Sequence, residues 1–190
     1  MKKEFIKLSG ILCIITLVAA MLLAGVNHIT KPKIAQAEEK AAAEAMKKIL
    51  PEADEFEEVD ESVFAGRKEG GIIGYCTKVT TTGYGGAIEM MVAFDLEQNI
   101  SGIEILSHSE TAGLGAKAAD KEFKDQFKGK SSNLTVVKGE SGSTQQVSAI
   151  TGATITSRAI AEKGIAAAKE KVMPYFETKL DEVIGNGGGK

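Results

Sequence analysis

The segment Thr151-Gly152-Ala153-Thr154 combines residue types that could hold a large anionic group. A glycine followed by an alanine lets the backbone approach a bulky ligand closely, and the residues that follow, 155–171, are predicted to form a helix. Free N–H groups and a partial positive charge at a helix N-terminus would stabilise a phosphate held at Thr154. On its chemistry alone, however, the segment is better explained as an ordinary tight turn, with Thr156 or Ser157 as the helix cap.

Two further glycine-rich segments precede this turn, at residues 83–88 and 108–115. In the second segment, Gly113 and Gly115 permit close approach of the backbone, while Glu110 and Thr111 supply hydrogen-bonding groups. These residues could form a slot for a flat ring, or only a turn that leads into a helix. In the first segment, Tyr84 could pack beside such a ring or cap a hydrophobic edge, and the sequence favours neither. His108 has no second histidine or cysteine at ligand spacing, so we predict no metal site.

In order and spacing, and with a hydrophobic N-terminal segment, these three segments resemble the G subunit of the Rnf electron-transport complex. That family is related to the C subunit of the sodium-translocating NADH:quinone reductase, and the resemblance extends over nearly the whole chain. It implies an FMN-binding domain in which the last threonine of a (Ser/Thr)-Gly-Ala-Thr motif, here Thr154, forms a phosphoester with FMN that a flavin transferase attaches. The resemblance also implies cofactor contacts from Thr151, Gly152, Ala153, Ser157, Glu110, Thr111, Gly113, Leu114, Gly115 and Tyr84.

The chain departs from the family pattern at two positions. Ser148 stands three residues before Thr151, where family motifs usually carry an aspartate, and Ala112 stands where the flavin loop usually carries a proline. The first change could slow the modification or require a different transferase, with Thr156 and Ser157 as fallback acceptors. The second loosens the loop but removes no polar contact. Because the acceptor and the Gly-Ala step are intact, we still expect covalent FMN at Thr154.

The first 28 residues predict a membrane anchor, because no charged residue occurs from Leu8 to Asn27 and the segment is about long enough to span a bilayer. No clear signal-peptidase site or lipidation cysteine follows, which favours a retained helix over a cleaved signal peptide. Lysines flank the segment on both sides in similar numbers, so the positive-inside rule gives almost no preference for either orientation in the membrane. The short N-terminal tail and the family resemblance favour a single-pass protein of the inner or cytoplasmic membrane, with its domain on the extracytoplasmic side.

Beyond the anchor (1–28), the chain divides into a helical stalk (29–51) that Pro51 ends, an FMN-binding domain (52–184) and a flexible tail (185–190). In the domain, β-branched and alternating patterns predict strands, and apolar spacing predicts two helices, the second kinked or ended by Pro174. Strands grouped before and around helices favour an α+β fold with a mixed or antiparallel sheet and flanking helices. The predicted strands are 71–82, 87–94, 100–107 and 133–138; the predicted helices are 118–127 and 155–171; residues 141–148 are predicted to be a loop.

Composition excludes several other classes. The net charge of −3 and the absence of a clustered basic face argue against nucleic-acid binding. The two cysteines cannot sensibly pair, because Cys13 lies in the apolar N-terminal segment and Cys76 in a predicted strand. Isolated cysteines do not form an iron–sulfur or zinc site, and we expect Cys76 to be buried.

The resemblance implies an electron-carrier subunit of a membrane-bound, ion-translocating ferredoxin:NAD⁺ oxidoreductase, which relays electrons through its FMN. Such a chain is part of an enzyme but is not catalytically complete alone. It lacks the G-x-G-x-x-G pattern of a nicotinamide site, and one helix without intramembrane charge cannot form an ion path. Its expected partners are the other membrane and peripheral subunits, the transferase and the lipid bilayer. The alternatives are a stand-alone anchored flavoprotein for extracellular electron transfer or redox sensing, and a flavin-free tethered domain.

Overall fold

The computed structural model describes residues 2–185, with side chains described from residue 7 to residue 177. The chain divides into two compact units, Met1–Ala41 and Ala42–Lys190. Of the predicted flexible tail, Gly185 is the last residue of a helix, and 186–190 lie outside the described residues.

The first unit consists of the greater part of helix α1 (Lys2–Ile49). The most apolar 18-residue window of this helix has a mean hydropathy of 2.5, and none of that window is buried in the protein. By length and composition, α1 is therefore able to cross a membrane, as the sequence predicts. The backbone shows one helix where the sequence predicts an anchor followed by a stalk. Pro32 lies inside it, and the helix ends just before Pro51 as expected.

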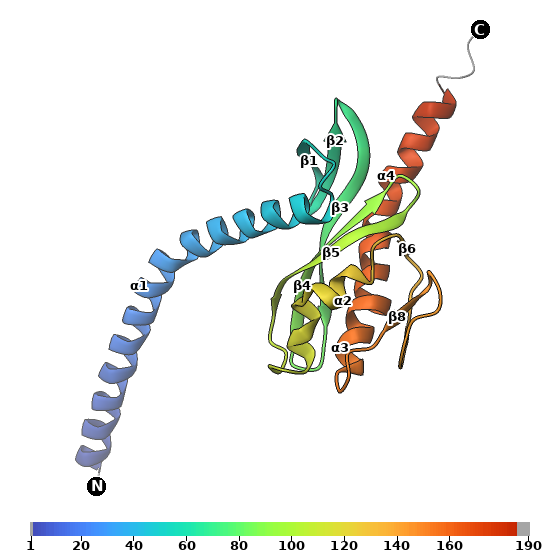
Figure 1. The fold of residues 1–190 in the computed structure, drawn as a ribbon. Coiled ribbons are helices and arrows are strands. Elements are labelled where there is room, and N and C mark those ends of the chain that lie inside the picture. The colour runs from blue at the N-terminus through green and yellow to red at the C-terminus, as the bar shows by residue number, and fades with distance from the viewer. Residues whose placement is uncertain (1, 186–190) are drawn as a thin grey trace. The chain divides into compact units, whose positions relative to one another are not determined.

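The second unit is built on a six-stranded sheet in which each strand pairs with the next one along the chain, always antiparallel (Figure 1). A second, two-stranded sheet is parallel. The predicted α+β class is thus confirmed, and of the two predicted kinds of sheet the main sheet is the antiparallel one. The main sheet contains β1 (Glu55–Asp60), β2 (Val63–Lys68), β3 (Gly71–Thr82), β4 (Ala87–Asp95), β5 (Asn99–His108) and β6 (Lys130–Ser131), and the small sheet contains β7 (Thr135–Val137) and β8 (Gln146–Ser148).

The strands with alternating or β-branched patterns lie where the sequence places them, in β3, β4, β5 and β7. Strand β8 was predicted to be a loop, and β1, β2 and β6 carry no clear strand pattern in the sequence. Most residues of β1 are acidic and exposed, so its conformation comes from pairing with β2 along the edge of the sheet. The short strands β6 and β8 likewise depend on their partners, which no local pattern reveals.

Two helical regions complete the unit. The predicted helix at 118–127 is a 3-10 helix, η1 (Gly115–Ala119), followed by α2 (Lys121–Asp125). The C-terminal helix is a continuous series of α3 (Thr154–Arg158), the π-helix η2 (Ala159–Gly164) and α4 (Ile165–Gly185). The sequence predicts that Pro174 either ends or kinks this helix. Pro174 does not end it, because α4 continues for another three turns. Pro174 and Glu170 are both exposed, so the carbonyl of Glu170 can bond to water instead of an N–H group.

The core lies on both faces of the sheet. Along β4, Ile88, Met90, Val92 and Phe94 face the layer that contains the C-terminal helix. The alternate residues of β4 join a smaller cluster on the other face, made with the last turns of α1 that belong to the second unit. That cluster consists of Ala45, Met46, Ile49, Leu50, Cys76, Met91 and Ala93. Cys76 is fully buried, as predicted, and its burial raises the pKa of the thiol to about 12.

Candidate functional site

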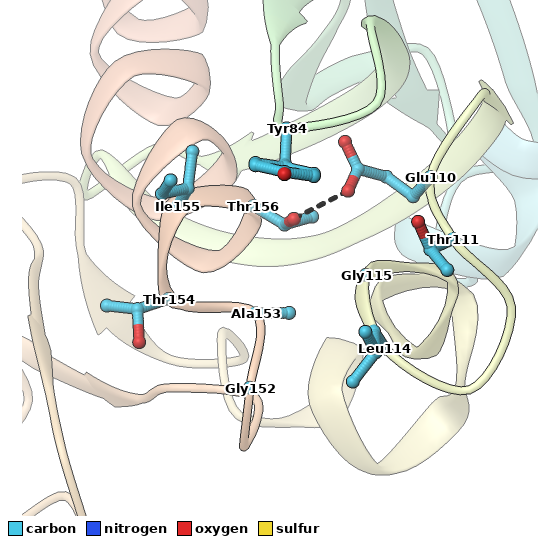
Figure 2. Close-up of a pocket in the computed structure, with 10 residues that line it drawn as sticks. All are labelled: Tyr84, Glu110, Thr111, Leu114, Gly115, Gly152, Ala153, Thr154, Ile155 and Thr156. Carbon is cyan, nitrogen blue, oxygen red and sulfur yellow. Dashed lines mark hydrogen bonds between the residues drawn. The ribbon is translucent and has the colours of Figure 1, made fainter.

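The three glycine-rich segments of the sequence meet at one end of the main sheet and enclose a pocket of about 470 Å³ (Figure 2). One wall comes from the turn between β3 and β4, a second from the loop after β5, and a third from the turn that starts α3. The lining residues are Tyr84, Glu110, Thr111, Leu114, Gly115, Gly152, Ala153, Thr154, Ile155 and Thr156.

The C-terminal helix reaches this end of the sheet because it follows β3. The hydroxyl of Thr81 donates a hydrogen bond to the carbonyl of Ala159, at 3.0 Å, where the helix widens into η2. Further along, the Nζ of Lys171 donates to the carbonyl of Lys78, at 3.2 Å. These contacts fix the start of α3 beside the turn between β3 and β4, where Gly83 donates to the carbonyl of Gly86 at 2.8 Å.

Glu110 links all three walls. Its Oε1 accepts a hydrogen bond from the backbone N–H of Gly85, at 2.9 Å, and its Oε2 accepts one from the hydroxyl of Thr156, at 2.7 Å. A Cβ atom on Gly83 would overlap Oε1, and one on Gly115 would overlap Oε2 and lie 2.8 Å from the Thr156 hydroxyl. The glycines at these two positions therefore make room for the carboxylate of Glu110, whereas the sequence suggested that Gly115 makes room for a ligand.

The turn before α3 places Thr154 at the margin of the pocket. Gly152 has a φ of 79°, a conformation that favours glycine, and Ala153 donates to the carbonyl of Ile150 at 2.9 Å. Helix α3 begins at Thr154, which is half-buried and lines the pocket. In Figure 2 its hydroxyl lies at the margin of the labelled side chains and points away from Tyr84 and Glu110.

The two fallback acceptors lie in the interior. Thr156 is fully buried and donates to Glu110. Ser157 is also fully buried; its hydroxyl donates to the carbonyl of Ala153 at 3.0 Å and accepts from the N–H of Ile150 at 2.9 Å. Both hydroxyls already have partners, and neither is open to solvent in this conformation.

Three predicted site residues do not line this pocket. Ser157 lies behind it, and Gly113 is exposed with a φ of 77° and open space beside its Cα atom. Thr151 lines a second, smaller pocket of about 230 Å³, together with Ser148 and the charged residues Lys117, Asp120 and Glu122. Conversely, the sequence did not single out Ile155 as a lining residue. An apolar residue in the first turn of an amphipathic helix is usually assigned to the core, so no local signal identifies it.

The rim of the pocket is apolar. Tyr84 is 75% exposed, Ile155 is 58% exposed and Leu114 is 45% exposed. Outside α1, only two other large hydrophobic side chains of the described residues are exposed, Val59 at 38% and Leu96 at 45%. Such a concentration of exposed apolar surface around a concave site is typical of a binding site. Of the ten lining residues, Glu110 is the charged one. Among the residues whose side chains are described, no cluster of three or more His, Cys, Asp or Glu residues could hold a metal.

Comparison with known proteins identifies two family matches. Residues 83–169, which include all three walls of the pocket, match the model of the FMN-binding domain. Residues 1–49, which correspond to the whole of α1, match the model of the RnfG N-terminal region.

Relatives match along most of the chain. Over 167 residues, the chain is 38% identical to the G subunit of the proton-translocating ferredoxin:NAD(+) oxidoreductase complex of Clostridium ljungdahlii, covering 86% of this chain and 89% of that one. It is 36% identical over 182 residues to the G subunit of the Na(+)-translocating complex of Acetobacterium woodii, covering 83% of this chain and 87% of that one. Among solved structures, the C subunit of the Na(+)-translocating NADH-quinone reductase from Parabacteroides distasonis matches with a TM-score of 0.52 and 27% identity, over 60% of this chain and 61% of that one. This last match spans less than two thirds of the solved chain, and it supports the α+β fold.

Proposed function

The chain belongs to the RnfG family, the G subunits of Rnf-type ion-translocating oxidoreductase complexes, and from this premise we propose that it carries electrons through an FMN attached covalently to Thr154. The observation that carries the proposal is the position of this residue. Thr154 is half-buried and lines the pocket, while the two hydroxyl-bearing residues that follow it are buried and hydrogen-bonded.

The residues present fit FMN. The apolar side chains of Tyr84, Leu114 and Ile155 could cover a flat ring that is only partly enclosed, and the pocket volume lies in the range of about 300–1,000 Å³ typical of ligand sites. The backbone N–H groups in the first turn of α3 have no partners within the helix and could donate to a phosphate at Thr154. When bound, FMN supplies redox chemistry that no side chain of the pocket provides.

A covalent tether agrees with this open pocket. Attachment fixes a high effective concentration of the cofactor, so the pocket need not enclose it. A flavin transferase would have to reach Thr154 at the margin of the pocket. Although Ser148 replaces the usual aspartate, the N–H group of Ser148 donates to the Oε1 of Gln126 at 2.8 Å, so the backbone before the turn is held by the residue that follows α2.

The remaining assignments follow from the family. We propose residues 1–28 as a membrane anchor, 29–51 as a stalk and 52–184 as the FMN-binding domain, on the extracytoplasmic side of the membrane. Ferredoxin and NAD(+) in the names of the relatives indicate the reaction of the whole complex. In such a complex this chain would relay electrons between other membrane and peripheral subunits, and the lipid bilayer would hold α1.

The experiment that tests this function is intact-mass measurement, with ultraviolet in-gel fluorescence, on denatured protein from its native membrane. We expect a fluorescent band whose mass includes FMN in the wild type and in Thr135→Val, a control that makes the same change at an exposed threonine of β7 outside the motif and the pocket. Thr154→Val should give a dark band of unmodified mass, and Thr154→Ser should retain some label. A label that persists in Thr154→Val would refute the assignment of the acceptor. Co-purification with integral membrane subunits would separate a component of a complex from a stand-alone flavoprotein.

A further inference from the structure

We propose that Glu110 sets the reduction potential of the pocket's cofactor, by holding a fixed negative charge in the pocket wall. This inference rests on the proposed function, because it assumes that FMN occupies the pocket. It assigns to Glu110 a role that differs from a direct hydrogen bond to the cofactor.

Both oxygens of the Glu110 carboxylate are already bound within the protein. Gly85 donates to one and Thr156 to the other, from two different segments of the chain. The absent side chains at Gly83 and Gly115 leave the space that each oxygen occupies. The carboxylate is therefore fixed by four neighbours, and turning it to bind a ligand would break both hydrogen bonds. In Figure 2 it lies between Tyr84 and Thr111 at the wall of the pocket.

The charge of this carboxylate is not neutralised by its described neighbours. Its two hydrogen-bond donors are a backbone amide and a hydroxyl, which are neutral groups. Within the part of the chain whose side chains are described, no lysine, arginine or histidine forms an ion pair with Glu110, and none lines the pocket. The glutamates of β5 and β4 differ in this respect, because Glu104 pairs with Lys124 at 2.8 Å and Glu89 pairs with Lys78 at 3.0 Å.

An unpaired carboxylate in the wall opposes the arrival of an electron. Electrostatic interactions weaken less with distance in a partly buried site than in water, and charges near the ring of a flavin alter its electronic properties. An electron that entered a bound flavin without a proton would raise the negative charge of the pocket, so Glu110 would make that reduction less favourable. The site is therefore built to keep the potential low, since its lining residues include one acid and no base to offset it.

The test is a potentiometric titration of the full-length, FMN-loaded protein with the Glu110→Gln variant. A glutamine has nearly the same shape; its amide oxygen can accept from Gly85, and the hydroxyl of Thr156 can rotate to accept from its NH₂ group. We expect Glu110→Gln to retain the FMN mass and to shift the one-electron reduction equilibrium about tenfold toward the reduced form, which corresponds to a potential about 59 mV higher. Glu122→Gln, which neutralises an exposed acid outside this pocket, should leave the potential unchanged.

Two further measurements keep the result decisive if Glu110→Gln carries little FMN. In Thr111→Lys, a cation added at an exposed lining position next to Glu110 should also raise the potential. In the FMN-free background of Thr154→Val, amide hydrogen exchange at Gly85 should stay slow in Glu110→Gln and become fast in Glu110→Ala, because only the alanine removes the acceptor. An unchanged potential in either loaded variant would overturn the inference, even if the exchange results agreed. If the wild type carries no FMN mass, the proposed function fails first and this inference fails with it.

Discussion

The two ends of strands β3 and β4 are built by different means, although the same C-terminal helix follows β3 along its length. At the pocket end, three loops are joined by the hydrogen bonds of one carboxylate and by glycines that leave it space. At the opposite end, Tyr75 of β3 packs edge-to-face on Phe176, with ring centroids 5.0 Å apart, and Phe94 of β4 is fully buried. Apolar packing tolerates changes that conserve volume. The arrangement of the loops at the pocket end depends instead on the two carboxylate oxygens of Glu110 and on the groups that donate to them.

This difference separates two properties of the molecule. The packed end contributes mainly to the stability of the fold, because burying aromatic side chains removes a large apolar area from water. The pocket end leaves apolar side chains exposed and holds its loops with polar contacts, so under the proposed function it contributes more to cofactor binding than to stability. Substitutions at the two ends should therefore affect different measurements.

The largest effect on stability is expected at the packed end. Phe94→Ala removes a ring that is fully buried, and such truncations lower the free energy of unfolding by about 3–5 kcal/mol. Chemical denaturation of the FMN-loaded protein measures this loss, and Phe94→Leu should lose less because it conserves more volume. The fraction of folded protein that carries FMN mass should not change. A parallel loss of FMN from protein that is still folded would show that the two ends are not independent.

At the pocket end we expect a smaller loss of stability than at the packed end and a larger loss of FMN. Gly115→Ala places a methyl group against the carboxylate of Glu110 and 2.8 Å from the Thr156 hydroxyl, so the loop must move away from the start of α3. We expect a moderate loss of stability, about 1–3 kcal/mol as for other overpacked sites, with a loss of most FMN from the folded protein. Gly142→Ala is the matched control, since the nearest atom to its new methyl group lies 3.8 Å away. Equal FMN content in both variants would refute this account of Gly115.

The sequence predicts these two ends unequally well. The alternation of β4 and the β-branched residues of β3 identify the strands and most of the core. Glycine-rich segments in a fixed order identify the walls of the pocket, through the family resemblance. The sequence could not show that Gly83 and Gly115 surround Glu110, or that Thr156 faces inward as a donor, because these contacts join residues between 5 and 46 positions apart. The edge strand β1 was not predicted for a similar reason. Its conformation depends on pairing with β2, and its own composition, which is mostly acidic, does not indicate a strand.

The pH dependence of stability tests whether water reaches the buried thiol of Cys76. Burial raises the pKa of its thiol from 9.0 to about 12, so above pH 9 the unfolded chain releases a proton that the folded chain retains. The unfolded state then binds fewer protons than the folded state, and stability falls as the pH rises from 9 toward 12. Between pH 8 and pH 10 this linkage lowers the free energy of unfolding by about 1.4 kcal/mol. Denaturation of Cys76→Ala isolates the effect, because its stability should fall less over the same range; identical slopes would show that water reaches the thiol.

The smallest effect is expected at the surface of the packed end, where the hydroxyl of Tyr175 in α4 donates to Asp60 of β1 at 2.6 Å. This hydrogen bond lowers the pKa of Asp60 below its ordinary value of 3.8 and raises the pKa of Tyr175 above its ordinary value of 10.0. The stabilisation is therefore complete between these two values. It is lost as the pH falls through the lowered pKa of Asp60, and also as the pH rises through the raised pKa of Tyr175.

Tyr175→Phe removes this contact but keeps the ring that packs 5.9 Å from that of Tyr75. At pH 7 we expect a slightly lower midpoint of thermal unfolding than in the wild type, and the two midpoints should converge as the pH falls through the lowered pKa of Asp60. Asp60→Asn should behave in the same way, because a neutral amide accepts a weaker hydrogen bond than a carboxylate. Since the contact lies outside the pocket, FMN content should be unchanged. A gap that persists at low pH would mean that Tyr175 stabilises α4 through packing alone, and the polar contact at this end would then contribute nothing to the fold.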